Sequence, residues 1–261
     1  MRFTRLSRLC CSVAFAACMQ CSCAPPPNHQ VSTGAGATKA SKAFQEDELA
    51  SIAEKAVAGE RTCVVDMVEK GADVNGRSRS GVPLILWVLE QGSVDGFSIL
   101  VDNGASVTAS VMKEAGEESN QCPRVIDYVM RAPVEYLKVV LSNGFDPDYV
   151  LQPDTKESLL FTAISLHSLP HMECLLNAGA TIDWRDSAGV TPVAKAQSLG
   201  DYELMWWLLE KGADPKLKDR WGYDVAANEK RFPRRQIDPA QKPWYDKVVA
   251  ELEKRGLTAK P

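Results

Sequence analysis

Histidine is the side chain that most often performs acid–base chemistry near neutral pH, and the 261-residue chain contains three histidines. His29 lies in a segment rich in Pro, Gly, Ala and Ser. His167 and His171 are four residues apart, a spacing that on one helix would place two imidazoles on the same face for a metal ion. Pro170 lies between them at a predicted turn between helices, so we do not expect them to share a continuous helix. The sequence therefore predicts no metal site at these histidines.

Cysteine chemistry is the second possibility, since five of the eight cysteines lie within the first 23 residues and three lie beyond them. Cys63 and Cys174 each fall in an apolar helical stripe, where a thiol usually packs as a small core side chain. In an oxidising compartment a disulfide could form among Cys63, Cys122 and Cys174, although the three lie far apart in the sequence and, as argued below, each is expected in a different repeat. The sequence contains no glycine-rich phosphate loop and no nucleophile elbow. We therefore predict no catalytic residue, no metal and no cofactor, although a site assembled from distant residues would leave no motif.

The first 23 residues have the pattern of an export signal. Arg2, Arg5 and Arg8 supply its positive charge, and residues 9–17 form a short apolar run that ends in small side chains. This run is too short to span a bilayer as a permanent helix. Residues 1–23 are therefore predicted to lie outside the fold of a chain that is exported to an oxidising compartment.

A possible lipid anchor follows from the sequence Phe15-Ala16-Ala17-Cys18, which is similar to a bacterial lipobox. The expected lipidation site is Cys18; Phe15 departs from the leucine that is usual there, and cleavage without lipidation is the alternative. Residues 24–44 are predicted to be a flexible tether, because Pro, Gly, Ala and Ser dominate them. We expect a periplasmic protein that is attached to the outer membrane only through this lipid.

One phrase, an apolar helix end followed by Gly-Ala-Asp or a close variant, recurs along the rest of the chain. It is clearest at Leu208-Leu209-Glu210-Lys211-Gly212-Ala213-Asp214. Its glycines are separated by 33, 40, 35 and 33 residues and lie at positions 71, 104, 144, 179 and 212. Glycine at this place suits a left-handed residue that ends a helix. A period near 33 is typical of a stacked array of helical units that bury their apolar faces only against one another.

The segments around these glycines resemble ankyrin repeats. The family's Thr-Pro-Leu-His motif is matched by Val82-Pro83-Leu84-Ile85 and, more closely, within Asp186-Ser187-Ala188-Gly189-Val190-Thr191-Pro192-Val193-Ala194. Degenerate copies are Cys122-Pro123-Arg124-Val125 and Glu157-Ser158-Leu159-Leu160. The resemblance covers about residues 45–230 and implies an all-α repeat solenoid, in which ankyrin-type helix pairs stack and extended finger loops join them.

Residues 45–261 are predicted to be the repeat domain, with five to six helix pairs. Apolar periodicity gives the pairs 46–58 with 61–70, 82–90 with 93–103, 123–131 with 133–143, 158–167 with 169–178, and 191–199 with 201–211. A capping helix is expected at 243–255, because its charged outer face suits the end of a stack. The 40-residue step indicates an acidic insertion at 107–121, either a binding element or a tolerated surface loop.

The resemblance implies binding to another protein rather than catalysis, at a concave face made of finger tips and the first helix of each pair. Two tryptophans at the finger tips have alternatives to partner binding. Trp184 could pack against the neighbouring finger, and Trp221 could contact the C-terminal cap. On the helix at 201–211, Trp207 is predicted to face inward and Trp206 outward. The tip residues whose types commonly anchor interfaces are Arg77, Arg79, Tyr149, Trp184, Arg185, Arg220 and Trp221.

Two functions remain for an exported binding module. The formal net charge of −4 argues against nucleic acid as the partner. The first function is that of an immunity or inhibitor protein, which blocks a secreted antibacterial effector such as a phospholipase delivered by type VI secretion. The second is that of a periplasmic scaffold, which supports an envelope or oxidative-stress enzyme. Both rest on a resemblance in fold, which does not by itself identify the partner.

Overall fold

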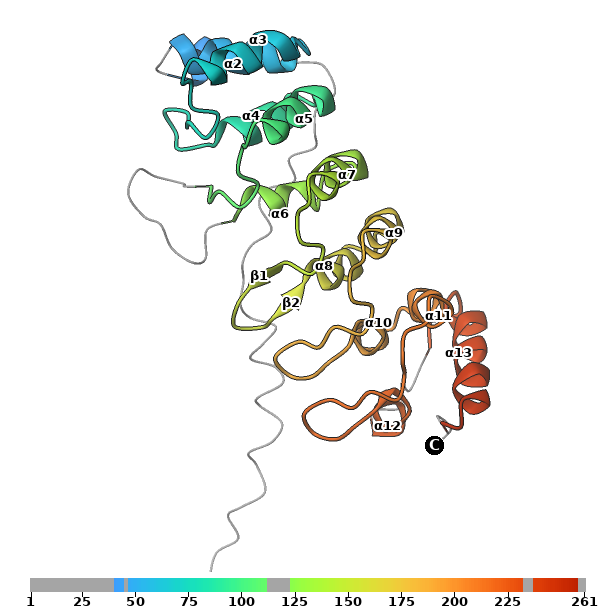
Figure 1. Cartoon of the computed structure of the whole chain (residues 1–261). Coiled ribbons are helices and arrows are strands. Elements are labelled where there is room, and N and C mark those ends of the chain that lie inside the picture. The colour runs from blue at the N-terminus through green and yellow to red at the C-terminus, as the bar shows by residue number, and fades with distance from the viewer. Residues whose placement is uncertain (1–39, 45–46, 112–122, 232–236, 258–261) are drawn as a thin grey trace, which may run out of the picture. The chain divides into compact units, whose positions relative to one another are not determined.

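Helical hairpins stacked one on the next make up the part of the chain that the structure describes. The computed structural model describes residues 40–44, 47–111, 123–231 and 237–257, all within one unit of the chain (Figure 1). The predicted all-α repeat solenoid is confirmed. In these residues the hairpins are α2 (Asp47–Val57) with α3 (Arg61–Glu69), α4 (Leu84–Glu90) with α5 (Val94–Asp102), α6 (Val125–Val129) with α7 (Val134–Ser142), α8 (Leu159–Ser165) with α9 (Leu169–Asn177), and α10 (Pro192–Leu199) with α11 (Tyr202–Glu210).

An extended loop, which we call a finger, joins each hairpin to the element that follows it. Figure 1 shows the fingers and the first helix of each hairpin on one side of the stack, and the second helices on the other side. Finger 3 contains a two-stranded antiparallel sheet that the sequence did not predict, β1 (Val150–Gln152) and β2 (Glu157–Ser158). Part of the predicted insertion in finger 2, residues 112–121, lies outside the described residues. Fingers 1 to 5 are residues 71–83, 104–124, 144–158, 179–191 and 212–224.

The recurring glycine ends a helix in the way that the sequence predicts. After α11, the Gly212 N–H donates to the Leu209 carbonyl at 3.2 Å and the Ala213 N–H donates to the Leu208 carbonyl at 3.0 Å. These two bonds satisfy carbonyls that the helix itself leaves without a partner, and they require a left-handed residue at the turn. Gly212 meets that requirement with a φ of 101°. The chain then leaves the helix toward the next finger.

Two interhelical turns lack the glycine that the others have, and each of the two is closed by a different backbone arrangement. His167 itself adopts the left-handed conformation, with a φ of 51°, and its N–H donates to the Ile164 carbonyl. Its Nδ1 lies 2.7 Å from Oδ2 of Asp201, the N-cap residue of α11. Ala132 does not adopt the left-handed conformation, and its N–H donates to both the Tyr128 and the Val129 carbonyl. A non-glycine residue can thus close this turn.

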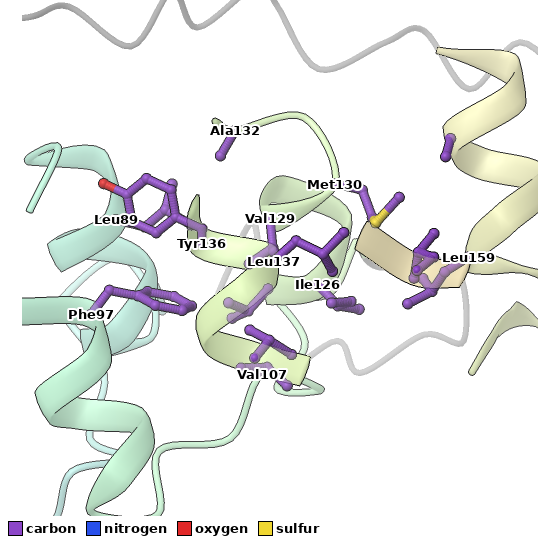
Figure 2. Packing of buried hydrophobic residues seen from close by; sticks show 14 of the residues in the cluster. Leu89, Phe97, Val107, Ile126, Val129, Met130, Ala132, Tyr136, Leu137 and Leu159 are labelled. Atoms are coloured by element: carbon purple, nitrogen blue, oxygen red, sulfur yellow. The ribbon is translucent and has the colours of Figure 1, made fainter. Parts of the chain in front are cut away.

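Apolar side chains from neighbouring hairpins form the continuous core between them. Phe97 of α5 meets Tyr136 of α7 edge to face, with 5.2 Å between the ring centres (Figure 2). Leu89, Ile126 and Leu159 come from three successive first helices and are almost fully buried. Since each hairpin has core side chains facing both neighbours, none can bury its apolar surface alone. Within the described residues, no helix has both the length and the apolar character needed to cross a membrane.

The fold begins before residue 45, where the sequence analysis placed its start. Helix α1 (Ala40–Ala43) lies inside the range 24–44 that was predicted to be a tether. Ala40 and Phe44 are buried, and the Phe44 ring meets the Trp87 ring of α4 edge to face at 5.7 Å. The Ala43 carbonyl also accepts the Arg79 N–H of finger 1 at 3.0 Å. Residues 40–44 therefore belong to the folded unit rather than to a tether.

The C-terminal helix α13 (Lys242–Lys254) packs against α11 rather than pairing closely with α12 (Val225–Arg231). The Arg255 guanidinium donates to the carbonyls of Leu209 and Ala213 at 3.1 Å each, so the end of α13 covers the end of α11. Trp206 and Trp207 are both half-buried, which corrects the prediction that Trp206 alone faces outward. Trp206 faces the cap, with its ring 5.9 Å from Lys247 Nζ.

Replacing Phe44 tests whether residues 40–44 belong to the fold. Phe44→Ala removes a side chain that is 2% exposed and is expected to lower the free energy of unfolding by about 3 kcal/mol, measured by chemical denaturation. Lys42→Ala is the control, because that side chain is exposed and its loss is expected to be neutral. Equal stability of the two variants would mean that residues 40–44 belong to the tether and not to the folded unit.

Candidate functional site

Neighbouring fingers are joined at their bases by a repeated side-chain hydrogen bond. The acceptor lies four residues after a recurring glycine, and the backbone donor lies two residues after the next glycine. Three of the neighbouring pairs of fingers show it: Asn75 Oδ1 accepts the Ser106 N–H at 2.8 Å, Asp148 Oδ1 accepts the Thr181 N–H at 2.8 Å, and Asp183 Oδ1 accepts the Asp214 N–H at 2.9 Å. This role was not predicted from the sequence, although the fixed distance of these residues from the glycines was a usable signal.

Two of the predicted partner-binding arginines join one finger to the next through their side chains. Arg77 lies six residues after Gly71, and its Nη1 donates to the Ser110 carbonyl at 2.7 Å and to the Gly81 carbonyl at 2.9 Å. Arg185 lies six residues after Gly179, and its guanidinium donates to the Lys218 carbonyl of finger 5. Both guanidinium groups therefore hold backbone carbonyls at the same place in the repeat. Whether they also contact a partner stays a prediction.

The finger tips are joined further out by backbone hydrogen bonds. The Ser187 N–H donates to the Thr155 carbonyl at 2.7 Å, and the Arg220 N–H donates to the Ala188 carbonyl at 2.9 Å. Trp184 is half-buried, and its Nε1–H donates to the Lys156 carbonyl at 2.7 Å. Contact with the neighbouring finger was the alternative considered for Trp184, and this bond shows that contact.

Tyr149 is also engaged within the protein. Its hydroxyl accepts a hydrogen bond from the Arg124 guanidinium, which lies 5.8 Å from the centre of its ring. The centre of the Phe145 ring lies 5.1 Å from the centre of the Tyr149 ring. The side chain is half-buried, so it offers only part of its surface to another molecule.

The tips of fingers 4 and 5 approach so closely that one position between them requires glycine. Gly189 has a φ of 75°, and a Cβ atom built there would lie 3.0 Å from the Arg220 backbone nitrogen and 3.1 Å from the Arg185 guanidinium. Gly222 occupies the same place in finger 5, three residues after the turn aspartate, with a φ of 85° and open space around it. The two glycines therefore share a conformation but differ in their surroundings.

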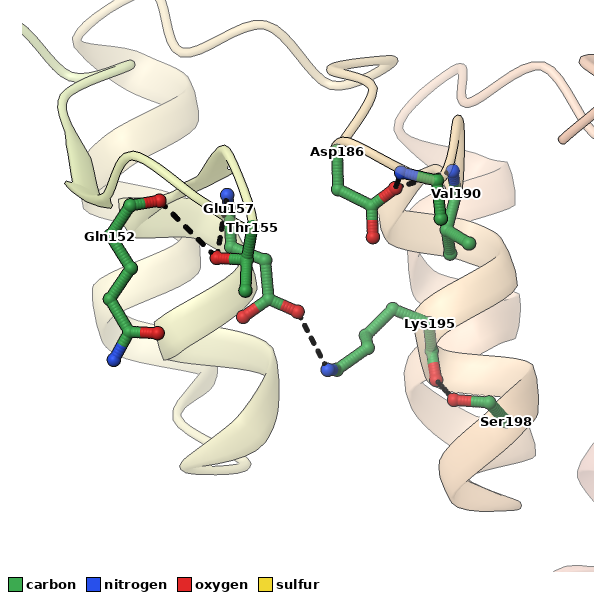
Figure 3. Close-up of polar contacts among 8 residues, drawn as sticks. Gln152, Thr155, Glu157, Asp186, Val190, Lys195 and Ser198 are labelled. Carbon is green, nitrogen blue, oxygen red and sulfur yellow. Dashed lines mark hydrogen bonds and ion pairs between the residues drawn. The ribbon is translucent and has the colours of Figure 1, made fainter. Parts of the chain in front are cut away.

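A polar cluster lies between finger 3 and the first helix of the following hairpin. Lys195 Nζ of α10 and Glu157 Oε1 of β2 form an ion pair at 2.9 Å (Figure 3). Asp186 Oδ1 accepts the N–H groups of Ala188 and Val190, at 2.8 Å each. Burial raises the pKa of the Asp186 carboxyl above its ordinary value, against the effect of these two bonds. Asp186 thus fixes the turn of finger 4, and the ion pair joins finger 3 to α10.

His171, Cys63 and Cys174 are packed within the helical hairpins. His171 is buried in α9, its Nδ1 lies 2.7 Å from Ser168 Oγ, and burial lowers the pKa of its imidazole. Cys63 and Cys174 are half-buried free thiols, and burial raises the pKa of the Cys174 thiol. No group of three or more His, Cys, Asp or Glu side chains suited to a metal ion occurs among the described residues. His29, Cys122 and the predicted lipidation site Cys18 lie outside them.

Three of the seven predicted partner-binding residues project into solvent without bracing another finger through their side chains: Arg79, Arg220 and Trp221. Trp221 is 53% exposed, more than any other large apolar side chain in the described residues. The Arg220 guanidinium carbon lies 4.2 Å from the centre of the Trp221 ring. Stacking of this kind holds a large apolar side chain and a fork of hydrogen-bond donors in one place. Fingers 4 and 5 therefore bring together Arg185, Arg220 and Trp221, whereas Arg77, Arg79 and Tyr149 lie on other fingers.

A pair of glycine variants tests the close approach of fingers 4 and 5. Gly222→Ala is expected to cost about 1 kcal/mol of unfolding free energy, because only the left-handed conformation is penalised. Gly189→Ala is expected to cost about 2–3 kcal/mol, since the added methyl group must also push the Arg220 backbone away. Chemical denaturation of both variants measures the difference. Equal losses would mean that the two tips are not in contact in solution.

Comparison with known proteins gives the same picture of the fold. Residues 128–219 match a family described as ankyrin repeats in three copies. A 100-residue segment is 33% identical to the human SH3 and multiple ankyrin repeat domains protein 2, but this segment is 38% of the chain and only 5% of that protein.

Two solved structures share the arrangement of helices. An ankyrin repeat domain from Acinetobacter baumannii AYE aligns with a TM-score of 0.53 and 17% identity, over 74% of this chain and 97% of that one. Another ankyrin repeat protein aligns with a TM-score of 0.52 and 18% identity, over 77% of this chain and 96% of its own. At such identities the likeness concerns the fold alone. The chain therefore has the ankyrin-repeat fold, and its residues 128–219 carry the sequence pattern of ankyrin repeats.

Proposed function

We propose that this chain is a non-catalytic docking protein and that the tips of fingers 4 and 5 bind its partner protein. Ankyrin repeats typically act as binding modules, and the observation that carries the proposal is the exposed pair of Arg220 and Trp221. Tryptophan and arginine are the side chains that most often dominate the binding energy of protein interfaces. An exposed tryptophan stabilises the folded chain little, so binding is the better explanation for its place at this tip.

The bracing between fingers supports the same site. Arg185 holds the Lys218 carbonyl, and the Arg220 N–H is bonded to the Ala188 carbonyl, so finger 5 is fixed against finger 4 before any partner arrives. A surface that is already ordered loses less conformational entropy on binding than a mobile loop does. The two fingers therefore offer a preorganised contact rather than one that must fold around its partner.

We further propose that the chain is exported to the periplasm, is held at the outer membrane through Cys18, and acts there as an immunity protein. The support is the leader sequence at 1–23 together with a binding fold, because a tethered module without chemistry of its own suits the capture of an incoming toxin. A secreted antibacterial effector such as a phospholipase is the proposed partner. A periplasmic scaffold for an envelope or oxidative-stress enzyme is the alternative that the second experiment below distinguishes.

Trp221→Ala tests the docking site. The full chain and the variant are used to capture partners from the producing cells, and the affinity of the recovered partner is then measured. Loss of the indole is expected to weaken binding of that partner by about 2 kcal/mol, or roughly 30-fold in affinity. The melting temperature of the variant is expected to stay within about a degree of that of the unchanged chain. Leu199→Ala is the matched control, because Leu199 is also exposed, at 43%, but lies at the end of α10 that is remote from finger 4. A loss with Leu199→Ala instead would move the binding site to the interhelical turns.

The immunity role is tested by co-expression. An antibacterial phospholipase recovered by that capture is directed to the periplasm of a host, together with the full chain or its Trp221→Ala variant. Survival is expected with the full chain and is expected to fall with the variant. A partner that is an envelope enzyme, whose activity changes on deletion of this chain while resistance to rival cells does not, would contradict immunity and support the scaffold.

A further inference from the structure

The outward charge of fingers 4 and 5 is of one sign. Both fingers are described throughout, and their exposed charged side chains are all positive: Arg185, Lys216, Lys218 and Arg220. Fingers 1 and 3 differ, because finger 1 exposes Asp73 as well as Arg79, and finger 3 exposes Asp146 and Asp154 as well as Lys156. Of the four fingers that the structure describes throughout, only fingers 4 and 5, beside Trp221, expose charge of positive sign alone.

The carboxylates of the same two fingers are turned toward the backbone. Fingers 4 and 5 contain five aspartates against four basic residues, so their net charge is not positive. Each aspartate is half-buried and accepts at least one backbone N–H. The acceptors and donors are Asp183 with Asp214, Asp186 with Ala188 and Val190, Asp214 with Lys216, Asp219 with Trp221 and Tyr223, and Asp224 with Ala227. A partner thus meets the cations first, while amide dipoles face the carboxylates.

The Arg220 and Trp221 pair at the tip of finger 5 limits the kinds of side chain that this tip can bind. The Arg220 guanidinium carbon lies over the Trp221 ring, 4.2 Å from its centre, and the exposed side chain keeps N–H groups that can donate hydrogen bonds to a partner. A guanidinium edge matches a carboxylate in a bidentate pair, and stacking on an aromatic ring fixes its orientation. The indole beside it is 53% exposed and offers apolar area to the next side chain of a bound segment.

We infer that the outward face of fingers 4 and 5 receives an acidic segment of the partner protein, in which a carboxylate lies next to an apolar or aromatic side chain. The inference rests on the proposed function and specifies the partner's chemistry. The carboxylate pairs with Arg220, the apolar side chain covers Trp221, and Lys216, Lys218 and Arg185 attract the remaining negative charge. The partner is acidic at its contact site even though this chain carries a net charge of −4.

A short synthetic peptide tests this chemistry on the full chain. Its glutamates flank a central phenylalanine, and a second peptide has glutamine at every glutamate position. Binding is followed by NMR at the Trp221 indole N–H and the backbone amides of residues 214–224. The acidic peptide is expected to shift these signals and to bind at least about tenfold more tightly than the glutamine peptide. Its affinity is expected to fall as salt is raised, because exposed charges are screened.

Charge variants locate the contact. Lys218→Gln with Arg220→Gln is expected to weaken the acidic peptide about tenfold, whereas Lys70→Gln with Lys138→Gln, which removes two exposed cations from the α3 end and from α7, is expected to leave it unchanged. Equal affinity for both peptides, no binding of the acidic peptide, or equal losses in both double variants would overturn the inference. So would tighter binding at these amides by a single-stranded oligonucleotide of equal charge. If capture of the protein partner still depends on Trp221 after any of those results, the proposed function stands while its acidic partner does not.

Discussion

Extended loops can be ordered only if their backbone N–H and C=O groups find partners, and in this protein fingers 2, 4 and 5 find some of them on the preceding finger. The Asp148 and Asp183 carboxylates hold the bases of the following fingers, and the Ser187 and Arg220 amides hold the tips. The bonds at the bases recur at fixed positions after successive recurring glycines, so they repeat with the helical hairpins. The order of the finger surface is therefore a property of the stack and not of any one loop.

This arrangement determines which side chains remain for a partner. A guanidinium at the sixth position after a recurring glycine is used internally, as Arg77 and Arg185 show. Aspartates at the turns are used to accept backbone amides. The side chains that remain exposed at the last tip are the stacked Arg220 and Trp221, together with Lys216 and Lys218 of the same finger. In the proposed function, the residues that brace the fingers and those that bind the partner are therefore different residues of one short segment.

Much of the fold could be predicted because the helix-ending glycine is a local signal. The predicted helix at 201–211 is Tyr202–Glu210 in the structure, and the turn after it has the two bonds that glycine permits. Residues 40–44 could not be assigned from the sequence, since so short a helix has no readable periodicity and is held by tertiary contact with Trp87. The role of Trp184 was equally hidden, because its acceptor is a backbone carbonyl 28 residues away and carries no side-chain signature. The sequence left two roles open for Trp221, an exposed anchor or contact with the C-terminal cap, and the structure shows it to be 53% exposed.

Hydrogen exchange, measured residue by residue in the free protein and in its complex, tests most directly whether a preordered finger surface does the docking. The amides of Ser187 and Arg220 are predicted to be protected already in the free protein, because each is bonded to the neighbouring finger. Binding is predicted to add protection in residues 214–224 and to leave the second helices α5 and α7 unchanged. Fast exchange at the two tip amides, or added protection confined to those second helices, would contradict the account.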